Sequence, residues 1–270
     1  MQRLKGLTTG SLPTFIDVSS NFASYEISED NIIDQLVKNN HRVVFAGDDT
    51  WTSLYPDSFT KAFPLPSFDV WDLDTVDKEV KKVLYSHLKS PNSWEVFIGH
   101  FLGVDHAGHK FGPNHPEMSR KLKEMNSVIE HVAKNLPSDT LLLVFGDHGM
   151  TNDGDHRGDS ENEVNAGLFA YSPALGMSSG PVTPSVAQID LVPTLSLLLG
   201  VPIPFSNLGT IIEKLFIPTS LMQDTNSNGY HSRQASYSSE NLINFGLSYE
   251  RNRHTPGHHV FFSEIFELIN

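Results

Sequence analysis

Two short segments of the sequence combine carboxylates with imidazoles at spacings that suit a bound metal ion. Asp105 and His109 stand four residues apart, so a helical turn or a tight loop can aim both at one ion. Asp147 and His148 are adjacent and followed by glycine, which lets a loop turn both side chains inward, and His156 comes shortly afterwards. Carboxylate oxygen with imidazole nitrogen suits zinc or manganese, whereas magnesium and calcium prefer oxygen alone. We therefore predict that these five residues are metal ligands, with zinc the preferred ion.

For several other acidic and histidine residues, an ordinary structural role competes with a role in binding metal or substrate. A single histidine is more often exposed or hydrogen-bonded than bound to a metal. We expect such roles for His100, His106, His115 and His131, with His106 the one expected to line the cleft. Asp48 and Asp49 are either loop residues that cap a helix or carboxylates that hold a substrate amine near the metals. Both interpretations stay open from the sequence.

The charge balance excludes one broad class of partner. The 270 residues include 19 Lys and Arg against 32 Asp and Glu, a formal charge of −13 at pH 7. Such a surface repels a phosphate backbone, so nucleic-acid binding is not expected. A phosphate-bearing substrate would need local positive charge, which bound cations can supply. The absence of cysteine removes disulfides, thiolate metal sites and thiol nucleophiles.

Three successive pairs of helix and strand are expected to position the candidate ligands. Each pair is a segment with helical apolar spacing followed by a short apolar run. The expected helices span 28–40, 72–88 and 116–136, and the strands after them span 42–47, 94–102 and 140–145. This repetition favours an α/β fold with a mostly parallel sheet and helices on both faces. Ligands bind such sheets at the carboxyl ends of the strands, and carboxylates follow all three strands.

The rest of the sequence predicts two more secondary-structure elements, followed by a segment of different composition. Residues 164–171 predict a strand and residues 188–199 a helix. Residues 217–270 differ in composition and predict a flexible tail, with helical turns in 260–269. No signal peptide is expected because the N-terminus lacks a continuous apolar stretch. No membrane span is expected either, since prolines interrupt the apolar residues 191–215.

Several motifs resemble those of one family of phosphoryl-transfer enzymes. The motifs are QRLKGLTTGSLPTFID (2–17), GDDTW (47–51), HFLGVDHAGH (100–109), GPNHPEM (112–118), GDHGM (146–150) and QIDLVPTLSLLLGVPIPFSNLG (188–209). They are similar to motifs of the GPI ethanolamine phosphate transferases, which belong to the alkaline phosphatase superfamily. The resemblance covers about residues 1–216 and implies an alkaline-phosphatase-like catalytic domain there, whereas residues 217–270 do not match.

The resemblance also implies two zinc ions. Asp105, His109 and His156 correspond to the ligands of one zinc, while Asp147 and His148 correspond to part of the second set. In the family the second zinc also takes an aspartate that follows the first strand and a threonine nucleophile.

Those last two residues have no counterpart in the sequence. The first strand, its aspartate and the threonine nucleophile are expected upstream of Met1, so the chain is expected to be truncated at both ends, with its catalytic residue unassigned. Thr8 and Thr9 match the helix after the nucleophile and are not expected to replace it. One complete zinc site would then remain.

The activity that the resemblance implies is transfer of phosphoethanolamine from phosphatidylethanolamine to a mannose of the GPI-anchor precursor. It implies the lumenal side of the endoplasmic reticulum membrane and, as partners, the two lipids and a stabilising membrane subunit. Two alternatives stay open. One is a soluble phosphodiesterase, sulfatase or nuclease of the same superfamily, and the other is an inactive metal-binding fragment.

Overall fold

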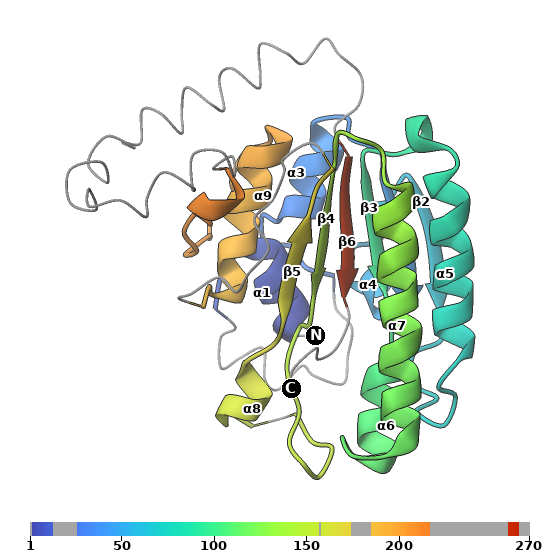
Figure 1. Cartoon of the computed structure of the whole chain (residues 1–270). Coiled ribbons are helices and arrows are strands. Elements are labelled where there is room, and N and C mark those ends of the chain that lie inside the picture. Colours follow the sequence, from blue (N-terminus) through green and yellow to red (C-terminus); the bar gives the residue numbers. More distant parts are fainter. Residues whose placement is uncertain (1, 13–25, 157, 174–184, 217–258, 265–270) are drawn as a thin grey trace, which may run out of the picture.

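A six-stranded sheet forms the centre of the molecule (Figure 1). The computed structural model describes residues 2–12, 26–156, 158–173, 185–216 and 259–264, the last as backbone only. The strands are β1 Val43–Asp48, β2 Lys61–Leu65, β3 Val96–His100, β4 Thr140–Phe145, β5 Leu168–Tyr171 and β6 His259–Glu264. Their order is β2-β1-β3-β6-β4-β5, and every neighbouring pair is parallel except β4 with β5. The mostly parallel sheet predicted from the sequence is confirmed.

Helices cover both faces of the sheet (Figure 1). On one face lie α1 Gln2–Thr9, α3 Ile32–Lys38 and α9 Leu191–Leu199, and on the other lie α5 Thr75–Leu88 and α7 Pro116–Asn135. Helix α6 Gly103–Phe111 follows β3 and contacts α7. Shorter elements are α4 Thr50–Leu54, α8 Glu161–Val164 and the 3-10 turns η1 Pro91–Ser93, η2 Gln188–Asp190 and η3 Glu213–Leu215. This is the layered α/β architecture that the repeated helix-strand pattern favours.

Strand β1 has apolar side chains on both faces of the sheet, so both faces must be covered. Val43 and Phe45 belong to the core that includes α1, α3 and α9, whereas Val44 and Ala46 belong to the core that includes α5 and α7. All four side chains are completely buried. Successive side chains of a strand point to opposite faces, so a continuous apolar run is what a doubly covered strand requires.

The C-terminal strand corrects one expectation from the sequence. Helical turns were expected in residues 260–269, but the backbone of β6 pairs in parallel with β3 on one side and β4 on the other. The helical periodicity of so short a segment is weak. The main-chain hydrogen bonds that β6 makes with two neighbouring strands outweigh it. Most of the predicted tail, 217–258 and 265–270, lies outside the described residues.

Other differences are local. Strand β2 and helix α4 were not predicted, because their short segments carry little periodicity. The expected strand over 164–171 begins only at Leu168, after the turn of α8, and runs antiparallel at the edge of the sheet. Among the described residues no helix combines the length and the apolar character needed to cross a bilayer.

Candidate metal centre

Helix α6 brings Asp105 and His109 to one side of a helical turn. The helix begins three residues after the end of β3, at the carboxyl edge of the sheet. Residues four apart in a helix share a face, and the Nε2 atom of His109 lies 3.3 Å from Oδ1 of Asp105. The helical turn considered from the sequence is therefore present, and it aligns the two side chains.

His156 approaches the same point from the loop that follows β4. Its Nε2 atom lies 2.9 Å from Nε2 of His109 and 3.7 Å from Oδ1 of Asp105. One potential ligand atom from each residue lies within 4.8 Å of the other two. Asp105 Oδ1 is buried and accepts no hydrogen bond from the described residues. Two ring nitrogens facing each other beside a buried carboxylate oxygen form a donor set that fits a divalent cation such as zinc.

Asp147 and His148 lie beside this group, directly after β4. The Nε2 atom of His148 is 3.5 Å from Oδ2 of Asp147, and the His148 ring stacks on the His156 ring with centroids 3.7 Å apart. The Nδ1 atom of His148 lies 2.9 Å from the carbonyl oxygen of Gly149. Donation through Nδ1 leaves Nε2 with its lone pair, which is the form in which histidine binds metals. All five predicted ligands are thus gathered at one place.

The electrostatics of the group favour neutral imidazoles at His148 and His156. Burial and, to a smaller extent, the neighbouring His156 together lower the pKa of His148 to about 3. Burial also lowers the pKa of His156, although Asp105 acts in the opposite direction. For Asp105, burial raises the pKa and the nearby imidazoles oppose this rise. Neutral imidazoles are ready to bind a cation, whose charge would in turn stabilise the buried carboxylate.

Asp48 and Asp49 lie at the end of β1, and the structure gives them different surroundings. Asp48 accepts the backbone N–H of Thr50 at 2.7 Å. Burial opposes its ionisation, but His100 and the hydrogen bonds lower the pKa of Asp48, so it is a carboxylate. Asp48 also acts electrostatically on the pKa of Asp105. Asp49 is the N-cap residue of α4 and makes no side-chain cap there.

Three other histidines have structural roles. The expectation that His106 lines the cleft is wrong, because this side chain is 3% exposed and its Nδ1 atom lies 3.0 Å from the carbonyl oxygen of Asp72. His100 is buried and accepts a hydrogen bond of 2.9 Å from Nε1 of Trp51. His131 lies on α7 and packs against the Tyr85 ring at a tilt, with centroids 4.0 Å apart.

Thr8 and Thr9 are structural residues of α1. Both side chains are buried, and their hydroxyls bond to carbonyl groups one turn earlier in the same helix. Thr8 also shares a hydrogen bond with the Tyr55 hydroxyl. Neither hydroxyl is presented as a nucleophile, which agrees with the expectation from the sequence.

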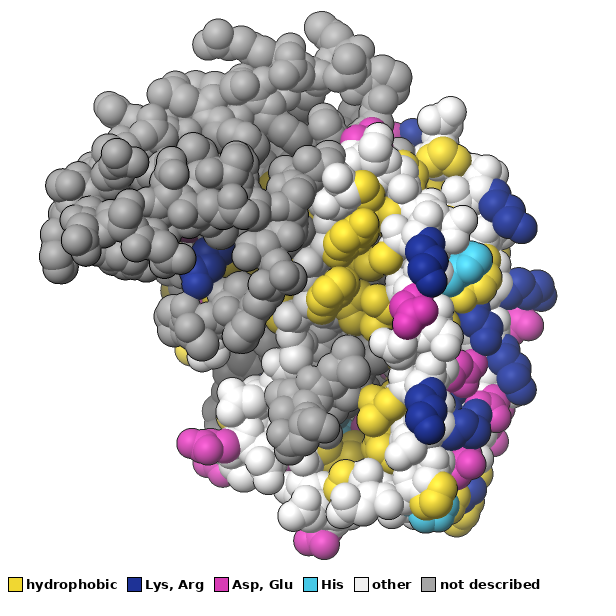
Figure 2. Space-filling model, viewed as in Figure 1, with side chains coloured by type: hydrophobic (Ala, Val, Ile, Leu, Met, Phe, Trp, Pro, Cys, Tyr) yellow, Lys and Arg dark blue, Asp and Glu magenta, His cyan; other side chains and the backbone are white. Residues whose placement is uncertain are grey.

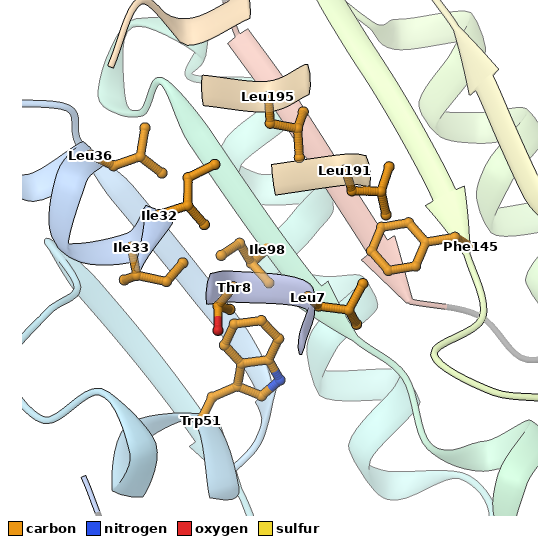
Figure 3. Close-up of a pocket in the computed structure, with 10 residues that line it drawn as sticks. All are labelled: Leu7, Thr8, Ile32, Ile33, Leu36, Trp51, Ile98, Phe145, Leu191 and Leu195. Carbon is orange, nitrogen blue, oxygen red and sulfur yellow. The ribbon is translucent and has the colours of Figure 1, made fainter. Parts of the chain in front are cut away.

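An apolar cavity of about 40 Å³ lies between α1, α3, α9 and the sheet (Figure 3). Its lining consists of Leu7, Thr8, Ile32, Ile33, Leu36, Trp51, Ile98, Phe145, Leu191 and Leu195. None of the five predicted metal ligands contributes to this lining. The cavity is therefore a packing feature of one core and separate from the metal centre.

Comparisons with known proteins agree with this architecture. GPI ethanolamine phosphate transferase 3, catalytic subunit, of Homo sapiens is 60% identical over 218 residues, which cover 80% of this chain and 20% of that protein. GPI ethanolamine phosphate transferase 3 of Saccharomyces cerevisiae is 48% identical over 228 residues, covering 80% of this chain and 22% of that protein. The chain spans about a fifth of the length of these relatives.

A solved structure supports the fold independently. The lipoteichoic acid synthase LtaP of Listeria monocytogenes superposes with a TM-score of 0.50 at 14% identity, covering 78% of this chain and 61% of that one. A model of the family described as type I phosphodiesterase / nucleotide pyrophosphatase matches residues 18–165, a range that includes all five candidate ligands. More than half of the sequence falls within that match, and the chain belongs to the type I phosphodiesterase / nucleotide pyrophosphatase family.

Proposed function

We propose that this chain provides the metal-binding part of the catalytic domain of a GPI ethanolamine phosphate transferase. The transferred group would be phosphoethanolamine, the donor phosphatidylethanolamine and the acceptor a mannose of the GPI-anchor precursor. The observation that carries the proposal is the convergence of Asp105, His109 and His156, whose ligand atoms lie within 4.8 Å of one another. The relatives named above support the choice of substrate class.

Each candidate residue has a part in this proposal. Asp105, His109 and His156 would hold one zinc ion, and Asp147 with His148 would contribute to a second. Zinc bound there would polarise a phosphodiester and lower the pKa of an attacking hydroxyl. The threonine that would carry this hydroxyl is proposed to lie outside residues 1–270.

Asp48 is the better of the two carboxylates for holding the substrate amine. Its lowered pKa keeps it ionised, and it is close enough to Asp105 to influence that residue's pKa. Asp49 accepts a hydrogen bond of 2.9 Å from the Ser67 hydroxyl, which also contributes to the lowered pKa of Asp48. An ammonium group bound at Asp48 would form a charge-assisted hydrogen bond with the carboxylate.

The setting and partners follow from the substrates. Both proposed substrates are membrane lipids, so we place the working protein at the lumenal face of the endoplasmic reticulum membrane, with a stabilising membrane subunit as a further partner. Nucleic acid is not a proposed partner, given the formal charge of −13.

Zinc binding is the first test. The purified chain should bind zinc in competition with a chromogenic chelator, and His109→Ala should weaken that binding at least tenfold because one of three ligands is lost. His131→Ala is the matched control, since this histidine lies on α7, packs against Tyr85 and is not one of the candidate ligands. Equal zinc affinity in all three proteins would refute the proposed centre.

Transfer activity needs a longer protein. Residues 1–216 can replace the matching segment of the yeast transferase 3, to which the chain is 48% identical. The chimera should add phosphoethanolamine to GPI precursors in yeast membranes, and the same chimera with His109→Ala should not. A chimera that accumulates normally, binds zinc and transfers nothing would contradict the substrate assignment. It would favour a phosphodiesterase or an inactive metal-binding role.

A further inference from the structure

The N-terminus of the helix that carries Asp105 and His109 is capped by a carboxylate from a different helix. Asp77 lies in the first turn of α5 and is 1% exposed. Its Oδ1 atom accepts the backbone N–H groups of Leu102 at 2.9 Å and Gly103 at 3.1 Å. Leu102 is the N-cap residue of α6 and has no side-chain cap of its own. Asp77 therefore supplies the missing cap and places negative charge at the positive end of the α6 dipole.

The other oxygen of Asp77 holds a buried ammonium group. The Nζ atom of Lys121, on α7, lies 2.6 Å from Oδ2 of Asp77, and the Lys121 side chain is completely buried. Glu124 and Asp74 also pair with this ammonium, at 2.9 and 3.4 Å. Burial alone lowers the pKa of Lys121, but the carboxylates more than offset it and raise the value. The lysine thus remains charged, and it fixes the orientation of the Asp77 carboxylate.

The pair of Asp77 and Lys121 is buried, unlike the exposed charges on the surface of α5 and α7. Acidic and basic side chains are interspersed over the surface of these helices (Figure 2), where Lys82 and Glu79 form an exposed pair. Exposed pairs of this kind contribute little to stability. The buried pair of Asp77 and Lys121 has no such surface role, and it links α5, α6 and α7 at the carboxyl edge of the sheet.

Gly103 shows how closely α6 contacts this pair. A Cβ atom added to Gly103 would lie 2.2 Å from Cε of Lys121, 2.3 Å from Oδ2 of Asp77 and 2.5 Å from the carbonyl oxygen of Leu73. No side chain fits at these distances without movement of the helix or its neighbours. The first residue of α6 is therefore a glycine at a site of direct contact, two residues before Asp105.

We infer that Asp77 is a positioning residue for the metal centre, which acts through the first turn of α6 and is itself held in place by Lys121. A shift of this turn would move the Asp105 carboxylate relative to His156, which comes from a separate loop and would not follow. The inference rests on the proposed function, because it explains how the chain holds one side of the proposed zinc site. Asp77 is not proposed to touch the metal.

Two substitutions test the inference from different directions. Asp77→Asn replaces the carboxylate by an amide, which accepts weaker hydrogen bonds from the start of α6 and loses the charge opposite Lys121. Gly103→Ala leaves Asp77 unchanged but forces the first turn of α6 away from it. We expect each change to weaken zinc binding roughly tenfold, the lower end of the usual effect of residues behind metal ligands. Each should also alter the visible absorption spectrum of the cobalt-substituted chain.

The controls match these substitutions in kind. Asn31 is completely buried and caps α3 by accepting the N–H of Asp34 at 3.0 Å, so Asn31→Ala removes a cap that lies elsewhere in the fold. Gly6→Ala adds a Cβ whose nearest atom is 3.5 Å away, an ordinary contact. Both controls should keep the zinc affinity and the cobalt spectrum of the unmodified chain.

Zinc affinity is measured by chelator competition, at a temperature where circular dichroism shows every variant to be folded. If Asp77→Asn does not fold, Gly103→Ala decides the question on the same measurements. Zinc affinity and cobalt spectra unchanged in the folded variants would overturn the positioning role while leaving the proposed function intact. Failure of the unmodified chain to bind zinc would overturn the proposed metal centre, and the positioning role with it.

Discussion

Replacing Lys121 by Met should destabilise the chain far more than replacing a lysine of the adjacent surface. The substitution keeps a long apolar side chain between Met118 and Met125, two buried residues of the same helix. It removes the ammonium that lies 2.6 Å from Asp77, a carboxylate with only 1% exposure. Loss of one partner from a buried ion pair typically costs about 3–5 kcal/mol. The two backbone N–H groups bound to Asp77 remain, so we expect about 3 kcal/mol.

Lys82→Met is the matched control for this prediction. Lys82 pairs with Glu79 at 3.0 Å, but the two side chains are 73% and 45% exposed. An exposed pair contributes at most about 1 kcal/mol, so the control should stay within that range. Both variants receive the same new side chain on helices that cover the same face of the sheet.

Urea denaturation of the metal-free chain, followed by circular dichroism, measures both losses. A double variant that combines Lys121→Met with Asp77→Asn should lose less stability than the sum of the two single changes, because the buried carboxylate is also removed. Equal losses for Lys121→Met and Lys82→Met would refute the reasoning, since burial would then make no difference. Strict additivity in the double variant would show that the two buried charges act independently.

Three further predictions concern the carboxyl edge of the sheet. Asp48→Asn should raise the KM of the transferase chimera for its donor about tenfold, because a charge-assisted hydrogen bond is lost, while Asp49→Asn should change it little. The pKa of Asp72 is lowered to about 2 by its hydrogen bonds to Thr75, so its stabilising effect is present above pH 4 and is lost as the pH falls towards 2. The free energy of unfolding should accordingly fall more steeply between pH 4 and pH 2 in the unmodified chain than in Asp72→Asn. Gly149→Ala places a Cβ 2.1 Å from a backbone oxygen and should cost about 2 kcal/mol in urea denaturation, unlike Gly99→Ala, whose nearest contact is 3.4 Å.

The sequence predicts the sheet and its helices well where the periodicity is long. Helices α5 and α7 carry apolar residues at helical spacing over several turns, and their predicted and observed limits agree within a few residues. The strand β6 could not be predicted in this way. Its place in the sheet depends on pairing with β3 and β4, which precede it by more than a hundred residues and leave no local signal in 259–264.

The candidate ligands could be singled out from the sequence because they cluster in glycine-containing segments directly after predicted strands. Asp105, His109 and Asp147 follow strands whose carboxyl ends must meet at one edge, so their convergence follows from the topology. The positioning role of Asp77 was not predicted. Its one visible signal is Lys121, a lysine that occupies an apolar position of α7 between buried methionines. Such a lysine indicates a buried partner, but the sequence does not say which carboxylate it is.

X-ray absorption at the zinc edge is the most direct measurement of the proposed centre. The zinc-loaded chain should show nitrogen and oxygen ligands at about 2.0–2.1 Å, with the multiple scattering of at least two imidazoles from His109 and His156. His109→Ala should lose one imidazole from this signal. Zinc surrounded by water oxygens alone, or a spectrum that His109→Ala leaves unchanged, would contradict the account.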